Sequence, residues 1–195
     1  MTSLVSVLDV SGSVFSLMAT FYFIAASRWA WGISLIAIAL NIVLYLYTGL
    51  FADALKDTIY LASVFYGWSL WLRGGQQGTE LPISHLSAAD AGRLLAIAGI
   101  AILIMSECLV HFTPSQVPYW DASTAGLSLL AQWLVCKKKV ECWILWFIVD
   151  AMYVGLFFYK GLFVHCGLYV FYCGLAGVGY WRWFHLMHKQ QLAPA

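Results

Sequence analysis

Long apolar stretches alternate with short polar segments along most of this chain. A run of about twenty apolar residues can cross the hydrocarbon core of a bilayer as an α-helix. Seven such runs occur, at residues 8–26, 30–49, 53–72, 92–111, 120–136, 141–159 and 162–184. The fifth run is the weakest, because it is short and rich in Ser, Thr and Gly. The pattern predicts an all-α polytopic membrane protein with seven transmembrane helices.

Composition agrees with this fold class and excludes several kinds of function. The 195 residues are 63% hydrophobic and 10% charged, whereas a soluble domain is about 25% charged. The net charge of +1 gives no electrostatic basis for binding nucleic acid. The five cysteines are odd in number, lack metal-ligand spacing and lie in or beside apolar runs. They indicate core-filling thiols rather than disulfides or zinc ligands, so we expect no metal and no cofactor.

The basic residues predict how the chain is oriented in the membrane. Cytoplasmic loops carry an excess of Lys and Arg. With the N-terminus outside, eight of the ten Lys and Arg fall on the cytoplasmic side, and only Lys56 and Lys160 fall outside. We therefore predict an outer N-terminus and a cytoplasmic C-terminus.

The sequence also contains an internal repeat. A shift of 112 residues aligns 31–71 with 143–183 without a gap. Identical pairs in this register include Trp31 and Trp143, Tyr60 and Tyr172, Gly67 and Gly179, and Trp71 and Trp183. Combined with seven helices, the repeat predicts two parallel three-helix bundles joined by a linker helix, a 3+1+3 arrangement. Its parts would be a first repeat at 1–72, a loop with the linker helix at 73–112, and a second repeat with a cytoplasmic tail at 113–195. Transporters commonly use such repeats and hold their substrate between the halves.

One acidic residue lies near the middle of the sixth run. An ionised acid there costs about 2.5–3.5 kcal/mol on insertion scales, so Asp150 should face the bundle interior or a water-filled cavity. Trp143 and Trp146 share its helical face, and Tyr153 and Phe157 continue that face. A carboxylate beside two indoles suits a flat, cationic, partly polar ligand. The spacing predicts a ligand-binding face, although Trp143 is also placed to join an interfacial aromatic belt.

The first half carries polar residues of its own. Asn41 lies in the middle of the second run, Asp57 lies near the outer end of the third, and Tyr60 is one turn deeper than Asp57. The repeat aligns Asn41 with Tyr153 and Asp57 with Tyr169, so the two halves would present different groups to a ligand. Two alternatives stay open: an interhelical hydrogen bond for Asn41, and a surface ion pair with the preceding lysine for Asp57.

These residues resemble the PnuC-type vitamin transporters. The resemblance covers about residues 30–183, and its most specific parts are the W-x-x-W-x-x-x-(N/D) stretch and the KKK segment just before it. It implies a 3+1+3 fold, similar to that of the SWEET sugar transporters, in a bacterial inner membrane. It also implies facilitated diffusion of nicotinamide riboside, which a cytoplasmic kinase phosphorylates and so traps. By motif, Trp143, Trp146 and Asp150 would contact the substrate.

The chain departs from the family pattern at two positions. Nicotinamide riboside members often have Asn where this chain has Asp150 and Gln where it has Asp57, which leaves thiamine transport open as an alternative. A membrane enzyme acting on lipid would need a nucleophile, a metal cluster or paired acids, and a non-transporting scaffold would not require a mid-membrane carboxylate. We therefore expect a transporter rather than an enzyme, with a vitamin and membrane lipid as its partners. The oligomeric state, ion coupling and the roles of Glu107 and the histidines stay open.

Overall fold

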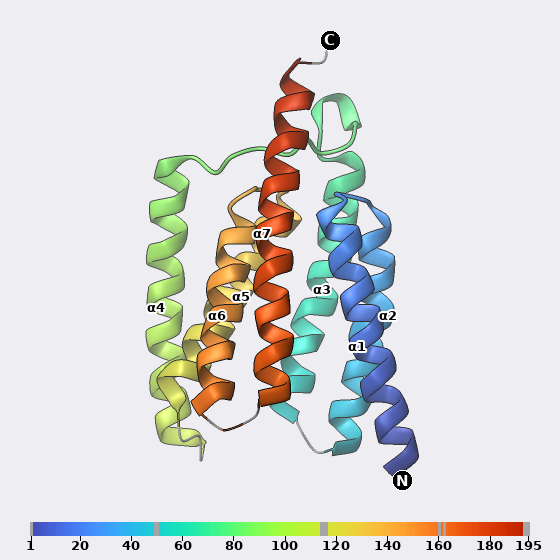
Figure 1. Cartoon of the computed structure of the whole chain (residues 1–195). Helices are drawn as coiled ribbons and strands as arrows, with labels where there is room; N and C mark the ends of the chain where they lie inside the picture. Colours follow the sequence, from blue (N-terminus) through green and yellow to red (C-terminus); the bar gives the residue numbers. More distant parts are fainter. Residues whose placement is uncertain (1, 49–50, 114–116, 160, 162, 193–195) are drawn as a thin grey trace. The chain divides into compact units, whose positions relative to one another are not determined.

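The structure is a computed structural model that describes residues 2–48, 51–113, 117–159, 161 and 163–192. These residues form seven α-helices and one short 3-10 turn, η1 (Gln76–Gly78) (Figure 1). The helices are α1 (Thr2–Ile24), α2 (Trp29–Thr48), α3 (Phe51–Arg73), α4 (Ala88–Phe112), α5 (Pro118–Cys136), α6 (Cys142–Tyr159) and α7 (Phe163–Leu192). Lys160 and the Gly49–Leu50 part of the repeat lie outside the described residues.

Each apolar run coincides with one helix, which confirms the predicted fold class. Several helices are longer than their apolar runs, and the extensions of α4 and α7 have clear local causes. α4 begins at Ala88 because Ser87 caps it, its Oγ accepting a hydrogen bond from the Asp90 N–H at 3.1 Å. α7 continues eight residues beyond 184 to Leu192, because the Leu, Met, Lys and Gln residues there favour helix even where the chain is no longer apolar.

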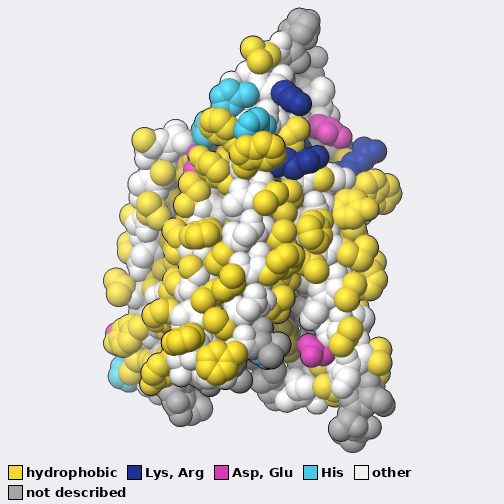
Figure 2. Space-filling view, in the orientation of Figure 1, with side chains coloured by type: hydrophobic (Ala, Val, Ile, Leu, Met, Phe, Trp, Pro, Cys, Tyr) yellow, Lys and Arg dark blue, Asp and Glu magenta, His cyan; other side chains and the backbone are white. Residues whose placement is uncertain are grey.

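The helices have the length and surface that a bilayer requires. The stretch Leu4–Ile24 of α1, together with α2, α4 and α6, is long and apolar enough to cross a membrane. On the face shown in Figure 2, hydrophobic side chains cover the helices along their length, and the Lys and Arg in view gather near the C-terminal end of α7. The chain is a multi-pass membrane protein.

The described chain packs as two compact units. The first contains Met1–Pro82, Cys136–Lys138 and His185–Ala195, and the second contains Ile83–Val135 and Lys139–Phe184. Within the first unit α1, α2 and α3 alternate in direction, as do α4, α5 and α6 within the second (Figure 1). The linker helix α4 thus groups with α5 and α6, while the last turns of α7 group with the first unit.

The turn before α2 and the turn before α6 share one backbone geometry. Ala26 (φ 53°) and Lys138 (φ 51°) have positive φ, and they lie 112 positions apart (138 − 26). In each turn the next residue's N–H donates to the carbonyl oxygen five residues earlier, at 3.0 Å in the first turn and 2.9 Å in the second. The register of the sequence repeat therefore holds in the backbone at both turns.

A cluster of tryptophans packs around a glycine in the first unit. The Trp31 and Trp71 rings meet edge to face, with centroids 5.4 Å apart and planes at 87°, and both side chains are at most 1% exposed. A Cβ on Gly67 would overlap the Trp31 ring, so only glycine lets α2 and α3 approach this closely. We call Trp31, Gly67 and Trp71 the first tryptophan cluster.

The second unit contains the same arrangement at the repeat-equivalent positions. The Trp143 and Trp183 rings meet edge to face, with centroids 5.5 Å apart and planes at 88°. A Cβ on Gly179 would overlap the Trp143 ring. We call Trp143, Gly179 and Trp183 the second tryptophan cluster. Matched packing in both units supports the internal repeat that the sequence predicts.

The lysines of the KKK segment have different surroundings. Lys138 is 5% exposed, and its Nζ lies 4.5 Å from the centroid of the Trp71 ring in the first unit. Burial lowers the pKa of Lys138, and the Glu80 carboxylate partly opposes that shift. In the second unit Lys139 Nζ donates to Ser84 Oγ at 2.8 Å. Lys138 and Lys139 thus each make a defined contact within the unit to which they belong.

Candidate functional site

Asp150 is buried in the middle of α6. It is the ninth of the 18 residues of this helix and is 9% exposed. On α7, Tyr172 and Cys173 lie close enough to Asp150 to interact with its charge. A carboxylate is costly to bury in a membrane and is usually retained there for function. The repeat supports that view, because the equivalent position in α2 is Ile38, so the helix pair does not require an acid there.

The two tryptophans that precede Asp150 have different surroundings. Trp143 is 4% exposed and belongs to the second tryptophan cluster. Its Nε1, like that of the equivalent Trp31, has no hydrogen-bond partner among the described residues. Trp146, one turn closer to Asp150, is half-buried, and its repeat-equivalent is Ser34. Trp146 thus differs between the repeats as Asp150 does, whereas Trp143 is shared by both.

Tyr153 and Tyr169 meet across the seam between α6 and α7. Their ring centroids are 4.7 Å apart. Phe157 lies 6.0 Å from Tyr153 and 5.3 Å from Tyr169, and His165 lies 5.2 Å from Phe157. At the other end, Tyr172 lies 6.0 Å from Tyr169. We call these five residues the aromatic row: Tyr172, Tyr169, Tyr153, Phe157 and His165.

The polar residues predicted from the first repeat lie within the first unit. Asn41 is half-buried on α2, and its Oδ1 occupies the space that a Cβ on Gly12 of α1 would fill. Asp57 is 6% exposed on α3. Tyr60 is half-buried one turn further along α3. Among the described residues, Asp57 in the first unit and Asp150 in the second are thus both buried carboxylic acids.

Tyr172 is a member of this site that sequence reasoning missed. The repeat aligns Tyr172 with Tyr60, which is itself a candidate substrate-binding residue. The alignment is the available signal, but only the structure shows that Tyr172 lies close enough to Asp150 to interact with its charge. Within the part of the chain that the structure describes, no three His, Cys, Asp or Glu side chains are grouped so as to hold a metal ion.

Comparison with known proteins identifies the family. The sequence profile described as "Nicotinamide mononucleotide transporter" matches residues 6–185. This chain belongs to the nicotinamide mononucleotide transporter family. The match begins within α1 and ends within α7, so every candidate site residue falls within the matched region.

Relatives within the transporter family differ in the vitamin they are named for. Nicotinamide riboside transporter PnuC of Escherichia coli (strain K12) is 27% identical over 152 residues, which cover 65% of this chain and 64% of the relative. Riboflavin/roseoflavin transporter RibM of Streptomyces davaonensis is 26% identical over 180 residues, covering 90% of this chain and 83% of the relative. This chain thus spans about 64% of the length of PnuC. Both relatives are transporters by name, in agreement with the expectation that this family member is not an enzyme.

A solved structure shares the fold. The crystal structure of the vitamin B3 transporter PnuC superposes with a TM-score of 0.74 at 21% identity, covering 94% of this chain and 83% of the other. This likeness confirms the all-α polytopic membrane fold.

Proposed function

We propose that this chain mediates uptake of nicotinamide riboside by facilitated diffusion, and that a cytoplasmic kinase traps the vitamin by phosphorylation. The buried Asp150 beside the aromatic side chains of α6 and α7 is the observation that carries the proposal. Nicotinamide riboside has a flat pyridinium ring and a ribose. Aromatic faces attract the cationic ring, and a carboxylate either pairs with its charge or accepts hydrogen bonds from the hydroxyls.

Each repeat carries candidate contact residues of its own. α6 and α7 would contribute Trp146, Asp150, Tyr153 and Tyr169. α2 and α3 would contribute Asn41, Asp57 and Tyr60. Trp143 carries the family motif as well, and its burial in the second tryptophan cluster supports an indirect contribution in which it fixes the rotation of α6.

The repeat supports a site for an unsymmetrical ligand. Asn41 is equivalent to Tyr153 and Asp57 to Tyr169, so the first repeat offers an amide and a carboxylate where the second offers two phenol rings. The two repeats therefore offer different chemical groups at equivalent positions, as suits a vitamin with a polar sugar end and an aromatic end.

Thiamine is the second candidate substrate. Two buried acids, Asp57 at 6% and Asp150 at 9% exposure, favour a cationic cargo, and the thiazolium ring of thiamine is a cation. The similarity to RibM adds riboflavin as a compound to test, although its neutral ring system gives a buried carboxylate no charge to pair with.

Binding and transport by the purified protein test this proposal. Calorimetry on the detergent-solubilised chain should show binding of nicotinamide riboside, and Asp150→Ala should weaken it at least tenfold. Ile148→Ala, at a 40% exposed position of the same helix, is the matched control and should bind like the parent. In liposomes the vitamin should equilibrate without concentrating when a proton or sodium gradient is imposed.

Three results would contradict the proposal. If the protein binds riboflavin but neither nicotinamide riboside nor thiamine, its substrate is the vitamin for which RibM is named. Concentrative uptake in either gradient would exclude facilitated diffusion. Parent-like binding by Asp150→Ala would remove Asp150 from the site.

A further inference from the structure

The aromatic row extends from the buried acid to one end of the second unit. Its rings follow one another from Tyr172, which is close enough to Asp150 to interact with its charge, to His165, near the start of α7. That start lies at the end of α6 remote from the turn between α5 and α6 (Figure 1). Asp150 and Tyr159, the last residue of α6, are nine positions apart, or about 14 Å at the rise of an α-helix.

Packing of the two helices does not require this row. The repeat aligns Phe157 with Tyr45, His165 with Asp53, and Tyr169 with Asp57, while Tyr153 aligns with Asn41. Thus α2 and α3 pack in the first unit without a continuous series of rings, although they retain the tryptophan cluster. The tryptophan clusters are common to both repeats and belong to the architecture. Tyr172 and Phe157 have the aromatic equivalents Tyr60 and Tyr45, whereas Tyr153, Tyr169 and His165 have none. The continuous row is therefore specific to the second repeat, which indicates a role other than packing.

The location of Asp150 indicates what this role is. A cation that moves about 14 Å from the helix end toward the buried carboxylate loses water before it gains its counter-ion. Ring faces offset part of this loss, because they attract cations and stack on flat rings without being charged themselves. The row members on the α6–α7 seam are half-buried rather than fully enclosed, apart from His165, which is exposed at the end.

We propose that the aromatic row is an access route with a binding subsite at its outer end, formed by Phe157, His165 and Tyr169, which receives the flat cationic ring of the cargo before it reaches Asp150. This inference rests on the proposed function, because it takes a vitamin with a cationic heteroaromatic ring as the cargo. The cargo moves along the row from one ring face to the next and reaches the Asp150 carboxylate last. The subsite determines how fast the cargo arrives, whereas Asp150 and its neighbours determine how tightly it is held.

Substitution of Phe157 separates these two roles. Phe157→Leu removes one ring from the row while leaving Asp150 and Trp146 intact. The protein is placed in liposomes with the α6–α7 end outside, and association of nicotinamide riboside chloride and of thiamine is followed by tryptophan fluorescence in a stopped-flow instrument. The association rate constant should fall about two- to fivefold, the contribution of one cation–π contact, while Kd changes less than twofold. Phe157→Trp should restore the parent rate.

The first repeat provides the matched control. Tyr45 is the repeat-equivalent of Phe157, so Tyr45→Leu also removes one ring, at the equivalent position of α2. This variant should keep the association rate constant of the parent. Phe157→Met keeps the side-chain volume without the ring and replaces Phe157→Leu if that variant does not fold. The inference is wrong if the Phe157 variants without a ring associate at the parent rate. It is also wrong if Tyr45→Leu lowers the association rate constant by the same factor, or if the Kd of Phe157→Leu weakens by as large a factor as its association rate constant falls. If the parent itself binds neither compound, the proposed function fails instead.

Discussion

At the scale of single residues, the repeat distinguishes groups that build the fold from groups that serve a ligand. Trp143 and Asp150 belong to one motif, yet Trp143 has a structural twin in Trp31 and Asp150 has an isoleucine, Ile38, as its equivalent. A motif can therefore combine a packing residue with a contact residue. The spacing alone cannot separate them, because both lie on the same helical face.

The charge of Asp150 can be tested apart from its shape. Asp150→Asn keeps the size and one acceptor oxygen. If the side chain accepts hydrogen bonds from ribose hydroxyls, binding of nicotinamide riboside should weaken by about 1 kcal/mol, the difference between a charged and a neutral hydrogen bond. If it pairs with the cationic ring in a dry site, the loss should be about 2 kcal/mol or more. Calorimetry on the purified variant measures the loss. Glu107→Gln, at an exposed position of α4, is the control, and an undiminished affinity in Asp150→Asn would show that the charge is not used.

At the scale of helices, each tryptophan cluster depends on one glycine. Gly67→Ala and Gly179→Ala each introduce a methyl group into the space of a tryptophan ring. Overpacking of this kind costs about 1–3 kcal/mol, so both variants should lower the Tm of the purified protein by several degrees. Gly174→Ala lies on α7 as Gly179 does, but its Cβ would meet no atom within 4 Å. Its Tm should equal or exceed that of the parent, because alanine favours helix over glycine.

Equal Tm values for Gly179→Ala and Gly174→Ala would contradict the packing that the structure shows. The two-repeat comparison adds a second check. Since the clusters have the same geometry, Gly67→Ala and Gly179→Ala should lower the Tm by similar amounts.

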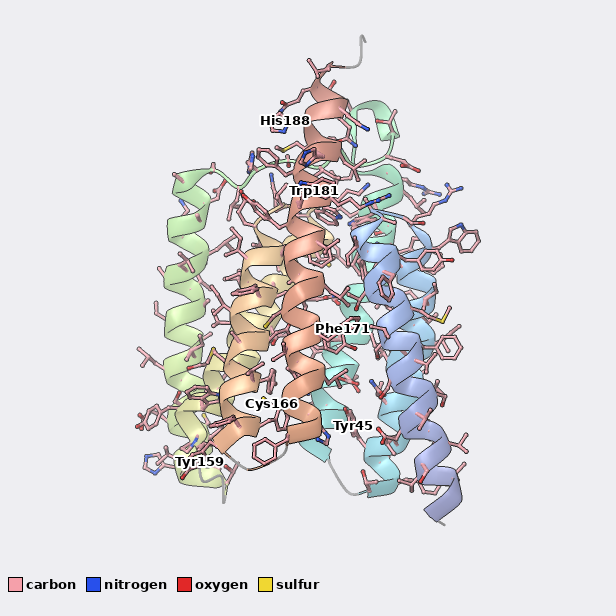
Figure 3. All side chains as sticks on the ribbon, viewed as in Figure 1. Tyr45, Tyr159, Cys166, Phe171, Trp181 and His188 are labelled. Carbon is pink, nitrogen blue, oxygen red and sulfur yellow. The ribbon has the colours of Figure 1, made fainter. Side chains whose placement is uncertain are left out.

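Most of the helical fold could be predicted from the sequence, whereas the contacts of the site could not. Apolar runs located all seven helices, because a membrane helix must be apolar over its whole length. The end of α7 was missed because its last residues are helical without being apolar (Figure 3, where His188 marks this part). The meeting of Tyr153 with Tyr169 depends on the rotation of α6 against α7. The Trp143 ring packs against Gly179 of α7 and limits that rotation, and hydropathy does not record this contact.

At the scale of the whole molecule, the basic residues predict the orientation. Eight of the ten Lys and Arg lie on one side if the N-terminus is outside. A reporter that fluoresces only in the cytoplasm should therefore be bright when fused after Ala195 and dark when fused after Thr113. Whole-cell fluorescence, normalised to the amount of each fusion on a gel, measures this. A dark fusion at Ala195 together with a bright one at Thr113 would mean that the chain is inverted.

The two tryptophan clusters also bear on the origin of the molecule. Each cluster is complete within three consecutive helices of its own repeat. An ancestral gene that encoded a single copy would already have specified all three members of such a cluster. Duplication and fusion then leave one copy free to diverge at positions such as 150 while both keep their cores. One repeat can in this way gain a carboxylate that the other repeat lacks.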